Sequence, residues 1–368
     1  MSGTADTGPE RPPLRDRVSA PPALALPSAG EGLTWRPVTA ADIGLILALK
    51  RDAGAIDHPH SLVTRDALEE EFRSESFRPE RDAVIALDAS GRAVAYGSAA
   101  PPATQETVVC VDLDGTVAPD RRREGIGTAL LAWQEACGLR YLATCETTLP
   151  GWLASGAQER ATSAIRLLEQ HGYERARWWW ELERDLKAPI AALPTAPGVR
   201  LVRYGPQWQE RARAATNEAF RDHWGSQPVT AADWAAGDRL AAFRPDLSVL
   251  AVTSGASGTA GAPGAPGAAD VSGAERVVGF VFVDVAPDEW PLRGGPFGYL
   301  TMVGVRREAR GQGLARTLLA HTLRTLREAG LDRAVLDVDA DSPTGALGLY
   351  QSLDFTPTER SVTLVKTF

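Results

Sequence analysis

The sequence has little lysine, cysteine or histidine, and each shortage excludes a class of protein. Only three of its 39 basic residues are lysine, the formal net charge is −8 and the sequence pI is about 5.3. A general nucleic-acid binder or a protein of anionic membrane surfaces needs a basic face, so neither partner is expected. Cys110, Cys137 and Cys145 form no C-x-x-C pair and have no histidine cluster beside them. We therefore expect no disulfide framework, no metal site, and reduced thiols in a cytoplasm.

Long hydrophobic runs are also absent, and no uninterrupted apolar stretch approaches the length of a membrane span. Residues 1–32 are rich in proline, glycine, alanine and serine, and no charged start leads into an apolar core. This composition predicts a disordered tail rather than a signal peptide. At 368 residues the remaining chain is too long for one typical core, so two domains are expected.

The two halves of the chain repeat one another. The segment "VAPDRRREGIGTALLAW" (117–133) aligns without a gap with "VRREARGQGLARTLLAH" (305–321), at an offset of 188 residues. Further on, "IRLLEQHGY" (165–173) matches "LGLYQSLDF" (347–355). A period this long indicates two copies of one domain rather than a solenoid.

We place the first domain at residues 33–186 and the second at 199–368, with the proline-spaced segment 187–198 as the linker. Residues 254–273 are nearly all glycine, alanine, proline and serine, and they stand between two predicted strands of the second domain. They are therefore interpreted as a flexible hairpin insertion rather than as a domain boundary.

Each copy is predicted to be a mixed α/β unit. A short strand passes into a helix, with Thr39 as the N-cap in the first copy, and extended segments follow. A strand, a glycine-rich turn and an amphipathic helix come next; in the second copy, leucines hold helical spacing after Gly313, and Gly330 ends the helix. A β-rich run, a short helix and a closing strand complete each copy: "ARWWWELERDL" in the first and "SVTLVKTF" in the second.

The turn between strand and helix has the pattern Arg-x-x-Gly-x-Gly/Ala in both copies. Small residues let the backbone approach a ligand, and successive N–H groups at a helix N-terminus favour phosphate oxygens. No Gly-Lys-Ser/Thr follows, so this is not a Walker loop, and the three glycines and acidic residue of a dinucleotide fingerprint are missing. The pattern predicts a pyrophosphate site of another kind.

The context of this turn adds specificity. Val-x-(Pro)-x-x-Arg-x-x-Gly-x-Gly/Ala, entering a leucine-rich helix and followed by Leu-Tyr-x-x-x-x-Phe, resembles the GCN5-related N-acetyltransferase (GNAT) superfamily. The resemblance covers both halves, is specific for the acyl-CoA site and is much weaker for the acceptor. The tandem arrangement is similar to the mycothiol synthase group of double acetyltransferases. It implies an α/β fold with a mixed sheet in each of two tandem acyl-CoA N-acyltransferase domains.

The resemblance also implies roles for particular residues. In the second copy, the backbone amides expected to hold the pyrophosphate of acetyl-CoA are those of Arg310, Gly311, Gln312, Gly313, Leu314 and Ala315. The strand groups expected to pair with pantetheine and polarise the thioester carbonyl are those of Met302, Val303 and Val305. Tyr350 matches the tyrosine that protonates the departing thiolate in many members, and Ser342 and Pro343 suit the start of its helix. The corresponding loop of the first copy comprises Val117, Arg122, Arg123, Gly125, Ile126 and Gly127.

Both copies depart from the family pattern. The first has Leu168 where the second has Tyr350, so we expect the first domain to be catalytically silent, either holding CoA structurally or empty. In the second copy, Asp341 stands where many relatives carry asparagine, which would alter pantetheine contacts. Asp354 stands where glycine usually precedes the final aromatic residue, which predicts a different turn.

The acceptor side is less readable. Glu218, His223 and Trp224 lie in "NEAFRDHWGS", where the first helices of the superfamily line the acceptor pocket, and an ordinary amphipathic helix with an aromatic staple is the alternative. A base must take the ammonium proton. The candidates for this role are Tyr299, Asp337, Asp339, Glu218 and His223.

The stretch "VVCVDLDGTVAPD" offers a competing interpretation, because Asp-x-Asp-Gly-Thr resembles the first motif of haloacid-dehalogenase-type phosphatases. The offset of 188 instead aligns Asp112 with Leu300 and Asp114 with Met302, so the two carboxylates are better explained as additions to the cofactor strand. We therefore expect an N-acetyltransferase that moves an acetyl or short acyl group from acetyl-CoA to a primary amine of a small molecule, without a metal, as a monomer or homodimer. The alternative is a non-catalytic CoA-binding, sensing or scaffolding protein.

Overall fold

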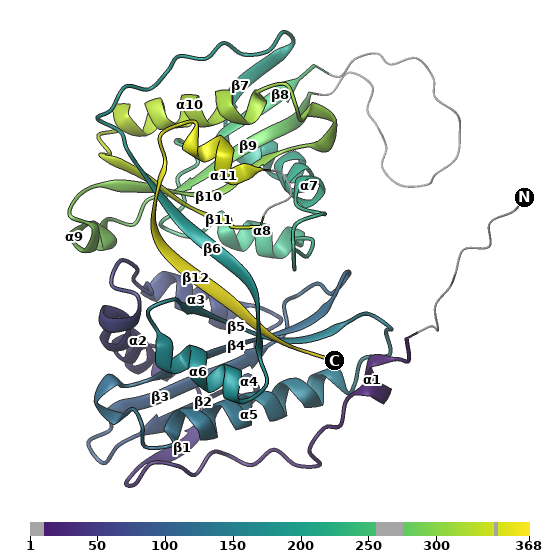
Figure 1. Ribbon diagram of the computed structural model, residues 1–368, viewed down its shortest axis with the longest axis vertical. Coiled ribbons are helices and arrows are strands. Elements are labelled where there is room, and N and C mark those ends of the chain that lie inside the picture. The colour runs from purple at the N-terminus through teal and green to yellow at the C-terminus, as the bar shows by residue number, and fades with distance from the viewer. Residues whose placement is uncertain (1–10, 255–274, 342–344) are drawn as a thin grey trace, which may run out of the picture. The chain divides into compact units, whose positions relative to one another are not determined.

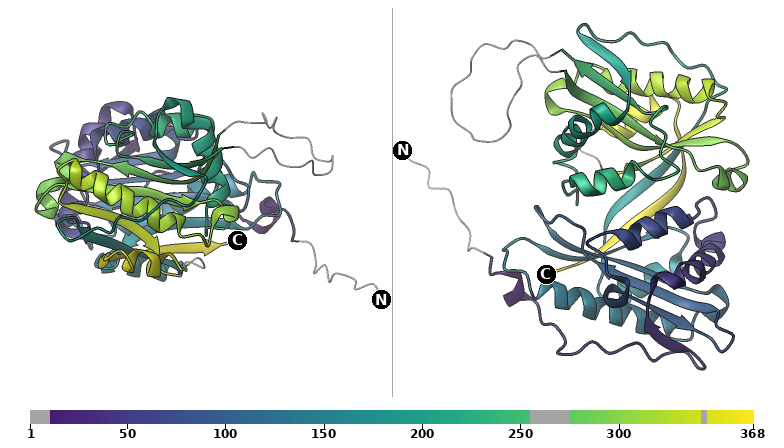
Figure 2. Two further views of the ribbon diagram at one scale, coloured as in Figure 1. Left: turned by 90° about the horizontal axis from the view of Figure 1, so that it is seen from above. Right: turned by 180° about the vertical axis from the view of Figure 1, so that it is seen from behind.

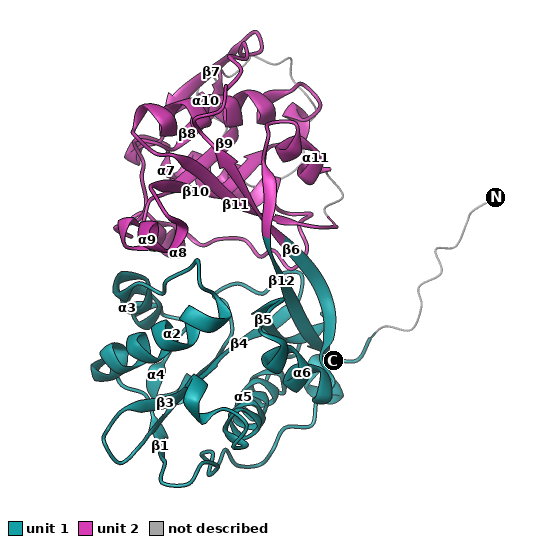
Figure 3. Cartoon of the chain, turned by 60° about the vertical axis from the view of Figure 1, so that its left-hand side comes forward, with its two compact units in different colours: residues 1–179, 359–368 teal, residues 180–358 magenta. Residues whose placement is uncertain are grey.

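The structure is a computed structural model of the chain, and it describes residues 11–254, 275–341 and 345–368. The chain divides into two compact units, drawn in different colours in Figure 3. Unit 1 comprises residues 1–179 and 359–368, and unit 2 comprises residues 180–358. The predicted insertion at 254–273 lies outside the described residues, apart from Ser254.

Unit 1 is a mixed sheet with helices packed against it. Its helices are α1 (Leu14–Arg17), α2 (Ile43–Asp57), α3 (Arg65–Arg73), α4 (Pro79–Asp82), α5 (Ile126–Leu142) and α6 (Thr162–Gln170), with short 3₁₀ turns η1 (Ala40–Asp42) and η2 (Pro119–Arg121). Its strands are β1 (Thr34–Pro37), β2 (Ala83–Leu87), β3 (Ala93–Ala100), β4 (Val109–Val117), β5 (Gly151–Gln158) and most of β12 (Thr356–Thr367), in that order across the sheet. All neighbours are antiparallel except β4 and β5, which are parallel.

The last strand divides the chain differently from the expected boundaries. Residues 361–367 of β12 pair antiparallel with residues 152–158 of β5, and Val362 and Leu364 are buried in the core of unit 1. The sequence pattern "SVTLVKTF" predicts the strand correctly, but alternating apolar residues do not specify which sheet they join. The closing residues 359–368, expected in the second domain, therefore belong to unit 1.

Strand β6 (Glu174–Asp185) carries the three consecutive tryptophans and passes from unit 1 into unit 2 at Trp180. In unit 1, the Trp179 indole N–H donates to Thr363 at 2.9 Å, and the Arg360 guanidinium lies 3.8 Å from the Trp178 ring centroid. In unit 2, Trp180 packs against the hydrophobic core. The three rings are thus used in packing within each unit.

The segment expected as a disordered tail is ordered from residue 11 onward. Leu14 is fully buried against β5, where a Cβ on Gly151 would approach its side chain to 2.7 Å. The Leu14 amide donates to Thr147 O, and Arg17 donates to the carbonyls of Leu149 and Phe368. Burying one leucine contributes about 2 kcal/mol. The prediction of disorder is therefore wrong for residues 11–32. The average composition of the segment does not reflect that one apolar side chain, Leu14, can anchor it in the core.

Unit 2 repeats this architecture. Its helices are α7 (Gln209–Ala219), α8 (Ala231–Gly237), α9 (Trp290–Arg293), α10 (Leu314–Glu328) and α11 (Ala346–Gln351), with 3₁₀ turns η3 (Pro206–Trp208), η4 (Pro287–Glu289) and η5 (Arg307–Ala309). Its strands lie in the order β6, β11 (Arg333–Asp339), β10 (Phe297–Val305), β9 (Arg276–Asp284), β8 (Val249–Thr253) and β7 (Val199–Arg203). Strands β7 to β10 pair antiparallel in succession, and β10 pairs parallel with β11.

Two apolar clusters cover the two faces of this sheet. Leu318, Leu319 and Leu323 of α10 are fully buried against one face, as their helical spacing predicts. On the other face, Ala212 and Ala215 of α7 and the ring of Trp234 on α8 pack with aromatic side chains of β9. Helix α10 lies in front of the sheet in Figure 1, and α7 and α8 come forward in the reversed view of Figure 2. No helix in the described part of the chain combines the length and apolar character needed to cross a bilayer.

Candidate active site

The site begins where two parallel strands of unit 2 separate. Strands β10 and β11 pair only over Phe297–Tyr299 and Arg333–Val335, and then run on to Val305 and Asp339 without pairing with one another. Backbone N–H and C=O groups of the second half of β10 are therefore open on the β11 side. An extended ligand can pair with such an edge as an added strand would. The predicted residues Met302, Val303 and Val305 all lie on this open segment.

A β-bulge sits where the strands part. The register between β10 and β9 shifts between Leu300 and Met302, so Thr301 is the extra residue. Bulges re-aim backbone groups and are over-represented beside active sites. The aligned strand of unit 1, β4, pairs with β3 from Asp112 to Val117 with no shift in register. The sequence offset alone does not reveal this difference between the copies.

The glycine-rich turn of unit 2 exposes three backbone amides. Gly311 and Gly313 have φ angles of 77° and 74°, a left-handed conformation that favours glycine. Within the described residues, the N–H groups of Gly311, Gln312 and Gly313 donate no hydrogen bond to another backbone group. Helix α10 starts at Leu314, so its first N–H groups and the positive end of its dipole face the same region. These groups fit a pyrophosphate.

Arg310 has a bracing role in this turn. Its guanidinium donates to Val305 O at 3.1 Å and to Ala219 O at 2.9 Å, which ties the end of β10 to the end of α7. Its own amide donates to Arg307 O at 3.2 Å. Of the amides predicted to hold the pyrophosphate, that of Arg310 is therefore already used within the protein.

Tyr350 lies on α11, the helix that follows β11. Its side chain is 6% exposed and makes an edge-on contact with Phe355, with ring centroids 5.7 Å apart. Burial raises the pKa of the phenol above its usual value, so the O–H stays protonated at neutral pH. Helix α11 starts at Ala346. Ser342 and Pro343, which were predicted as its start, lie outside the described residues.

Asp354 does not produce the different turn that the sequence predicted. It adopts a φ of 63°, the left-handed conformation that a glycine would take, and Phe355 N–H still donates to Tyr350 O at 3.2 Å. Aspartate tolerates this conformation better than most residues, which explains why the turn survives the substitution. Asp341, the other departure, donates its amide to the Asp339 carboxylate at 2.9 Å.

Three residues nominated for the acceptor side are sorted by their contacts. The Glu218 carboxylate is bound by the Arg306 guanidinium and lies 3.8 Å from Arg276, so it belongs to an ion-pair network at the end of α7. His223 follows in the next turn, with its ring 5.5 Å from that of Phe220, and Trp224 is partly buried. Glu218 is therefore a structural partner of Arg306, and only His223 and Trp224 keep the predicted acceptor role.

Two of the nominated proton acceptors are brought together. The Tyr299 hydroxyl donates to the Asp337 carboxylate at 2.6 Å, across the rung where β10 and β11 begin to separate. Asp339 is 3% exposed and accepts the Asp341 amide. One carboxylate in the same neighbourhood, Asp284 at the end of β9, was missed by sequence reasoning, because nothing in its local pattern sets it apart from a solvated strand end.

Unit 1 keeps the turn and lacks the acid. Strands β4 and β5 pair over four residues from Val109 to Asp112 and then part, and the Arg122 guanidinium donates to Val117 O and to the Asp57 carboxylate. Ile126, at the start of α5, is buried, and a Cβ on Gly127 would lie 3.3 Å from Leu167. Leu168, in place of a tyrosine, is a core residue that is 6% exposed.

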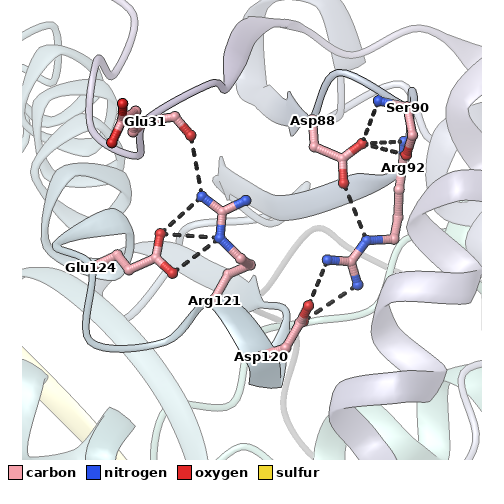
Figure 4. A network of polar contacts seen from close by, with 7 residues as sticks. All are labelled: Glu31, Asp88, Ser90, Arg92, Asp120, Arg121 and Glu124. Atoms are coloured by element: carbon pink, nitrogen blue, oxygen red, sulfur yellow. Dashed lines mark hydrogen bonds and ion pairs between the residues drawn. The ribbon is translucent and has the colours of Figure 1, made fainter.

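Charged side chains occupy this turn in unit 1, as Figure 4 shows. Glu124, which aligns with Gln312, is held by Arg121, and Arg121 also donates to the Glu31 carbonyl. Nearby, Arg92 joins Asp88 to Asp120. A carboxylate beside the turn amides opposes a bound phosphate electrostatically unless its paired arginine compensates.

The Asp-x-Asp-Gly-Thr motif lies along β4 of unit 1. Asp112 accepts from the Cys110 thiol at 3.5 Å, and Asp114 forms an ion pair with Lys50, whose ammonium lies 5.3 Å from the centroid of the Tyr96 ring. In the described residues, histidine, cysteine and acidic side chains nowhere gather in threes that could hold a metal ion. Asp114 aligns with Met302 of unit 2. Unit 1 therefore has an ion-paired carboxylate at the strand position where unit 2 has an apolar side chain.

Arg123 in the unit 1 turn is strained. It adopts a φ of 71° at the position of Gly311, and its side chain is exposed. A non-glycine residue costs about 1 to 2 kcal/mol in this conformation. Replacing Arg123 by glycine is therefore expected to raise the free energy of unfolding of unit 1 by about 0.5 to 1 kcal/mol, after the greater freedom of glycine in the unfolded chain is subtracted. Urea denaturation of the full chain measures it.

The matched control is Glu124→Gly at the next residue, which loses the Arg121 contacts and is expected to lower the unfolding midpoint. A midpoint lowered equally by both substitutions would show that the left-handed backbone at residue 123 carries no strain.

The chain matches known proteins in both sequence and fold. The family model described as "Acetyltransferase (GNAT) family" matches residues 259–355. The chain is 35% identical over 242 residues to the mycothiol acetyltransferase of Salinispora arenicola, covering 65% of this chain and 67% of that protein. It is 30% identical over 332 residues to the mycothiol acetyltransferase of Geodermatophilus obscurus, covering 86% of this chain and 91% of that protein. This chain belongs to the GNAT family of acetyltransferases.

Solved structures agree on the fold of this GNAT protein. A GCN5-related N-acetyltransferase from Sphaerobacter thermophilus covers 92% of the chain with a TM-score of 0.65 at 23% identity, over 97% of its own length. A tandem GNAT protein from the clavulanic acid biosynthesis pathway covers 91% with a TM-score of 0.60 at 19% identity, over 98% of its length. The family model and the relatives confirm the predicted family and the acyltransferase activity, and the solved structures confirm the α/β fold with tandem GNAT domains.

Proposed function

We propose that unit 2 transfers an acetyl group from acetyl-CoA to the primary amine of a small molecule, and that unit 1 performs no chemistry. One observation carries the proposal. In unit 2 an open, bulged strand edge leads into a turn with three available amides, and a protonated tyrosine follows on α11. Unit 1 has the turn but neither the bulge nor the tyrosine.

The proposed binding of acetyl-CoA uses backbone groups. The amides of Gly311, Gln312 and Gly313 and the first turn of α10, from Leu314 and Ala315, hold the pyrophosphate. The open edge of β10, from Met302 to Val305, pairs with pantetheine, and its N–H groups polarise the thioester carbonyl. Such preorganised donors act where negative charge develops, in a site shielded from water, and they supply the largest share of the rate enhancement.

The proposed chemistry needs no protein nucleophile. The amine attacks the thioester carbon directly, and the Tyr350 hydroxyl gives its proton to the sulfur as the C–S bond breaks. The raised pKa of Tyr350 keeps this proton on the phenol at neutral pH before the reaction begins.

The names of the relatives suggest the acceptor. Two relatives are named mycothiol acetyltransferase, a name that points to the amine of mycothiol lacking its acetyl group as their acceptor. We extend this acceptor to the present chain. The formal net charge of −8 is compatible with a cationic amine substrate.

The test is to incubate the full chain with acetyl-CoA and a panel of amines: mycothiol lacking its acetyl group, glucosamine and L-cysteine. Chromatographic detection of free CoA and of the acetylated product avoids interference from thiol-bearing acceptors. Turnover with at least one amine is expected, and the mycothiol precursor should give the highest kcat/KM. Binding of acetyl-CoA without acetylation of any amine would favour the alternative of a CoA-binding protein without transferase activity.

A further inference from the structure

Three neighbouring strands of unit 2 carry polar side chains in one row. Asp284 of β9 pairs in register with Tyr299 of β10, and the Tyr299 hydroxyl donates to Asp337 of β11 at 2.6 Å. The residues next to them in sequence, Val283, Leu300 and Leu336, are buried in the core against α10. Since successive side chains of a strand point to opposite faces, the row lies on the face covered by α7 and α8.

The row lies beside the proposed thioester position. Tyr299 belongs to the last rung that joins β10 to β11 before the strands part. On the β9 side, the Asp284–Tyr299 rung is followed by Val283 with Leu300 and then, just past the bulge, by Phe282 with Met302. Two residues along a strand span about 7 Å. Asp284 is therefore within the reach of a small amine, or of an amine and one water, that attacks at Met302.

The Asp284 carboxylate has no counter-ion among the described residues. It is partly buried, and within the described residues no cation and no hydrogen-bond donor contacts its side chain. Phe243 forms an isolated β-bridge with Asp284 on the side away from β10. Phe282, two residues before Asp284 on β9, points to the same face of the sheet. The nearest arginine in that segment, Arg244, is engaged with Asp246 through two hydrogen bonds.

The groups that face Asp284 are therefore apolar, neutral or acidic. They are the two phenylalanines, the hydroxyl-bearing ring of Tyr299 from β10, and Glu289 from η4. Burial, with a smaller contribution from Glu289, raises the pKa of Asp284 to about 6. A carboxylate that titrates near neutral pH both takes up and releases protons under working conditions, which suits general base catalysis.

We propose that Asp284 accepts the proton of the attacking amine, directly or through one water, and that Tyr299 orients this amine. Because Tyr299 donates its own hydrogen to Asp337, its oxygen is left to accept a hydrogen bond from the amine N–H. This inference rests on the proposed function of unit 2. It adds to the nominated bases a residue that sequence reasoning did not single out.

The protons of the proposed reaction balance. The acceptor binds as an ammonium ion and gives one proton to Asp284, and the free amine then forms the N–C bond to the acetyl carbon. As the C–S bond breaks, the sulfur takes the Tyr350 proton, and the second nitrogen proton is returned through solvent to Tyr350. The sum is amide, CoA thiol and one proton, which Asp284 releases to water.

The test compares Asp284→Asn with the unchanged chain across pH 5 to 9. The unchanged chain should lose kcat/KM as pH falls through about 6, where the carboxylate becomes protonated. In Asp284→Asn, kcat/KM at pH 7.5 should fall about 10- to 100-fold and this acidic limb should disappear. Asp284→Glu should restore the limb and part of the rate. The Kd of acetyl-CoA should not rise and the Tm should not fall, because the side chain has no counter-ion to lose.

Controls separate this role from other causes. Asp288→Asn changes an exposed carboxylate four residues away and should leave the profile unchanged. Two acceptors with different amine pKa values should give the same acidic limb if Asp284 causes it. Slow hydrolysis of acetyl-CoA, in which water replaces the amine, supplies a second rate that depends on no acceptor.

The outcomes distinguish the two proposals. An active chain whose rate and acidic limb survive in Asp284→Asn would overturn the role of Asp284 and leave the transferase function standing. An unchanged chain with neither amine acetylation nor acetyl-CoA hydrolysis would overturn both.

Discussion

Replacing Tyr350 by phenylalanine is expected to lower kcat about 100- to 1000-fold, while the Kd of acetyl-CoA changes less than threefold. The ring stays in the core against Phe355, so packing is retained and only the hydroxyl is lost. Without it the thiolate must leave unprotonated or take its proton from water, and general acid catalysis is worth about 10² to 10⁴ in rate. Steady-state kinetics with the best acceptor, together with calorimetric titration of acetyl-CoA, separate the two quantities.

Tyr173→Phe is the matched control. Tyr173 is also a buried tyrosine, 3% exposed, but it lies in unit 1 and aligns with Phe355. It should leave kcat unchanged. A Tyr350→Phe variant that is as active as the Tyr173→Phe variant would remove Tyr350 from the mechanism.

Replacing Gly313 by aspartate is expected to raise the KM for acetyl-CoA about 100-fold, which corresponds to about 3 kcal/mol of lost binding. The new carboxylate would stand at the N-terminus of α10, beside the amides that we propose hold the pyrophosphate. Two negative charges there repel one another, and the amides of the turn are re-aimed by the change of residue at a φ of 74°. Initial rates over a range of acetyl-CoA concentrations measure the effect.

The duplicated turn offers an internal control, Gly125→Asp in unit 1. Gly125 has a φ of 79° and caps α5 as Gly313 caps α10, and a Cβ on either glycine would meet nothing within 4 Å. The two variants therefore carry a similar strain and should lose similar stability. Only the unit 2 variant should lose acetyl-CoA-dependent activity. Equal losses of kcat/KM from both would contradict the assignment of catalysis to unit 2.

Much of the proposed cofactor site could be predicted from the sequence because it is built from local backbone conformation. Glycines at 311 and 313 specify the left-handed turn, and the leucine spacing after them specifies α10 and its buried face. The alignment at an offset of 188 residues carried the same prediction into unit 1, and the match of residues 165–173 with 347–355 revealed the missing tyrosine at Leu168. The family assignment followed from these short motifs.

The acceptor side could not be predicted in the same way, because it depends on which strands become neighbours. Asp284 and Tyr299 are 15 positions apart and Asp337 is 38 further on, and only the pairing of β9, β10 and β11 puts them in one row. Glu218 was nominated for the amine, but its contact with Arg306, 88 positions away, makes it a structural ion pair. Charge alone does not tell a ligand-facing carboxylate from a paired one.

The repeat, the α/β class, the glycine-rich turn and the position of the tyrosine follow from local sequence patterns, since each is set by residues close together in the chain. Three features became visible only in the folded chain: residues 359–368 complete the sheet of unit 1, Leu14 anchors a segment of low-complexity composition, and Thr301 forms a bulge that the aligned strand of unit 1 lacks. Each of these depends on a partner strand or core surface far away in sequence. Local patterns specify the element, and long-range packing specifies its neighbour.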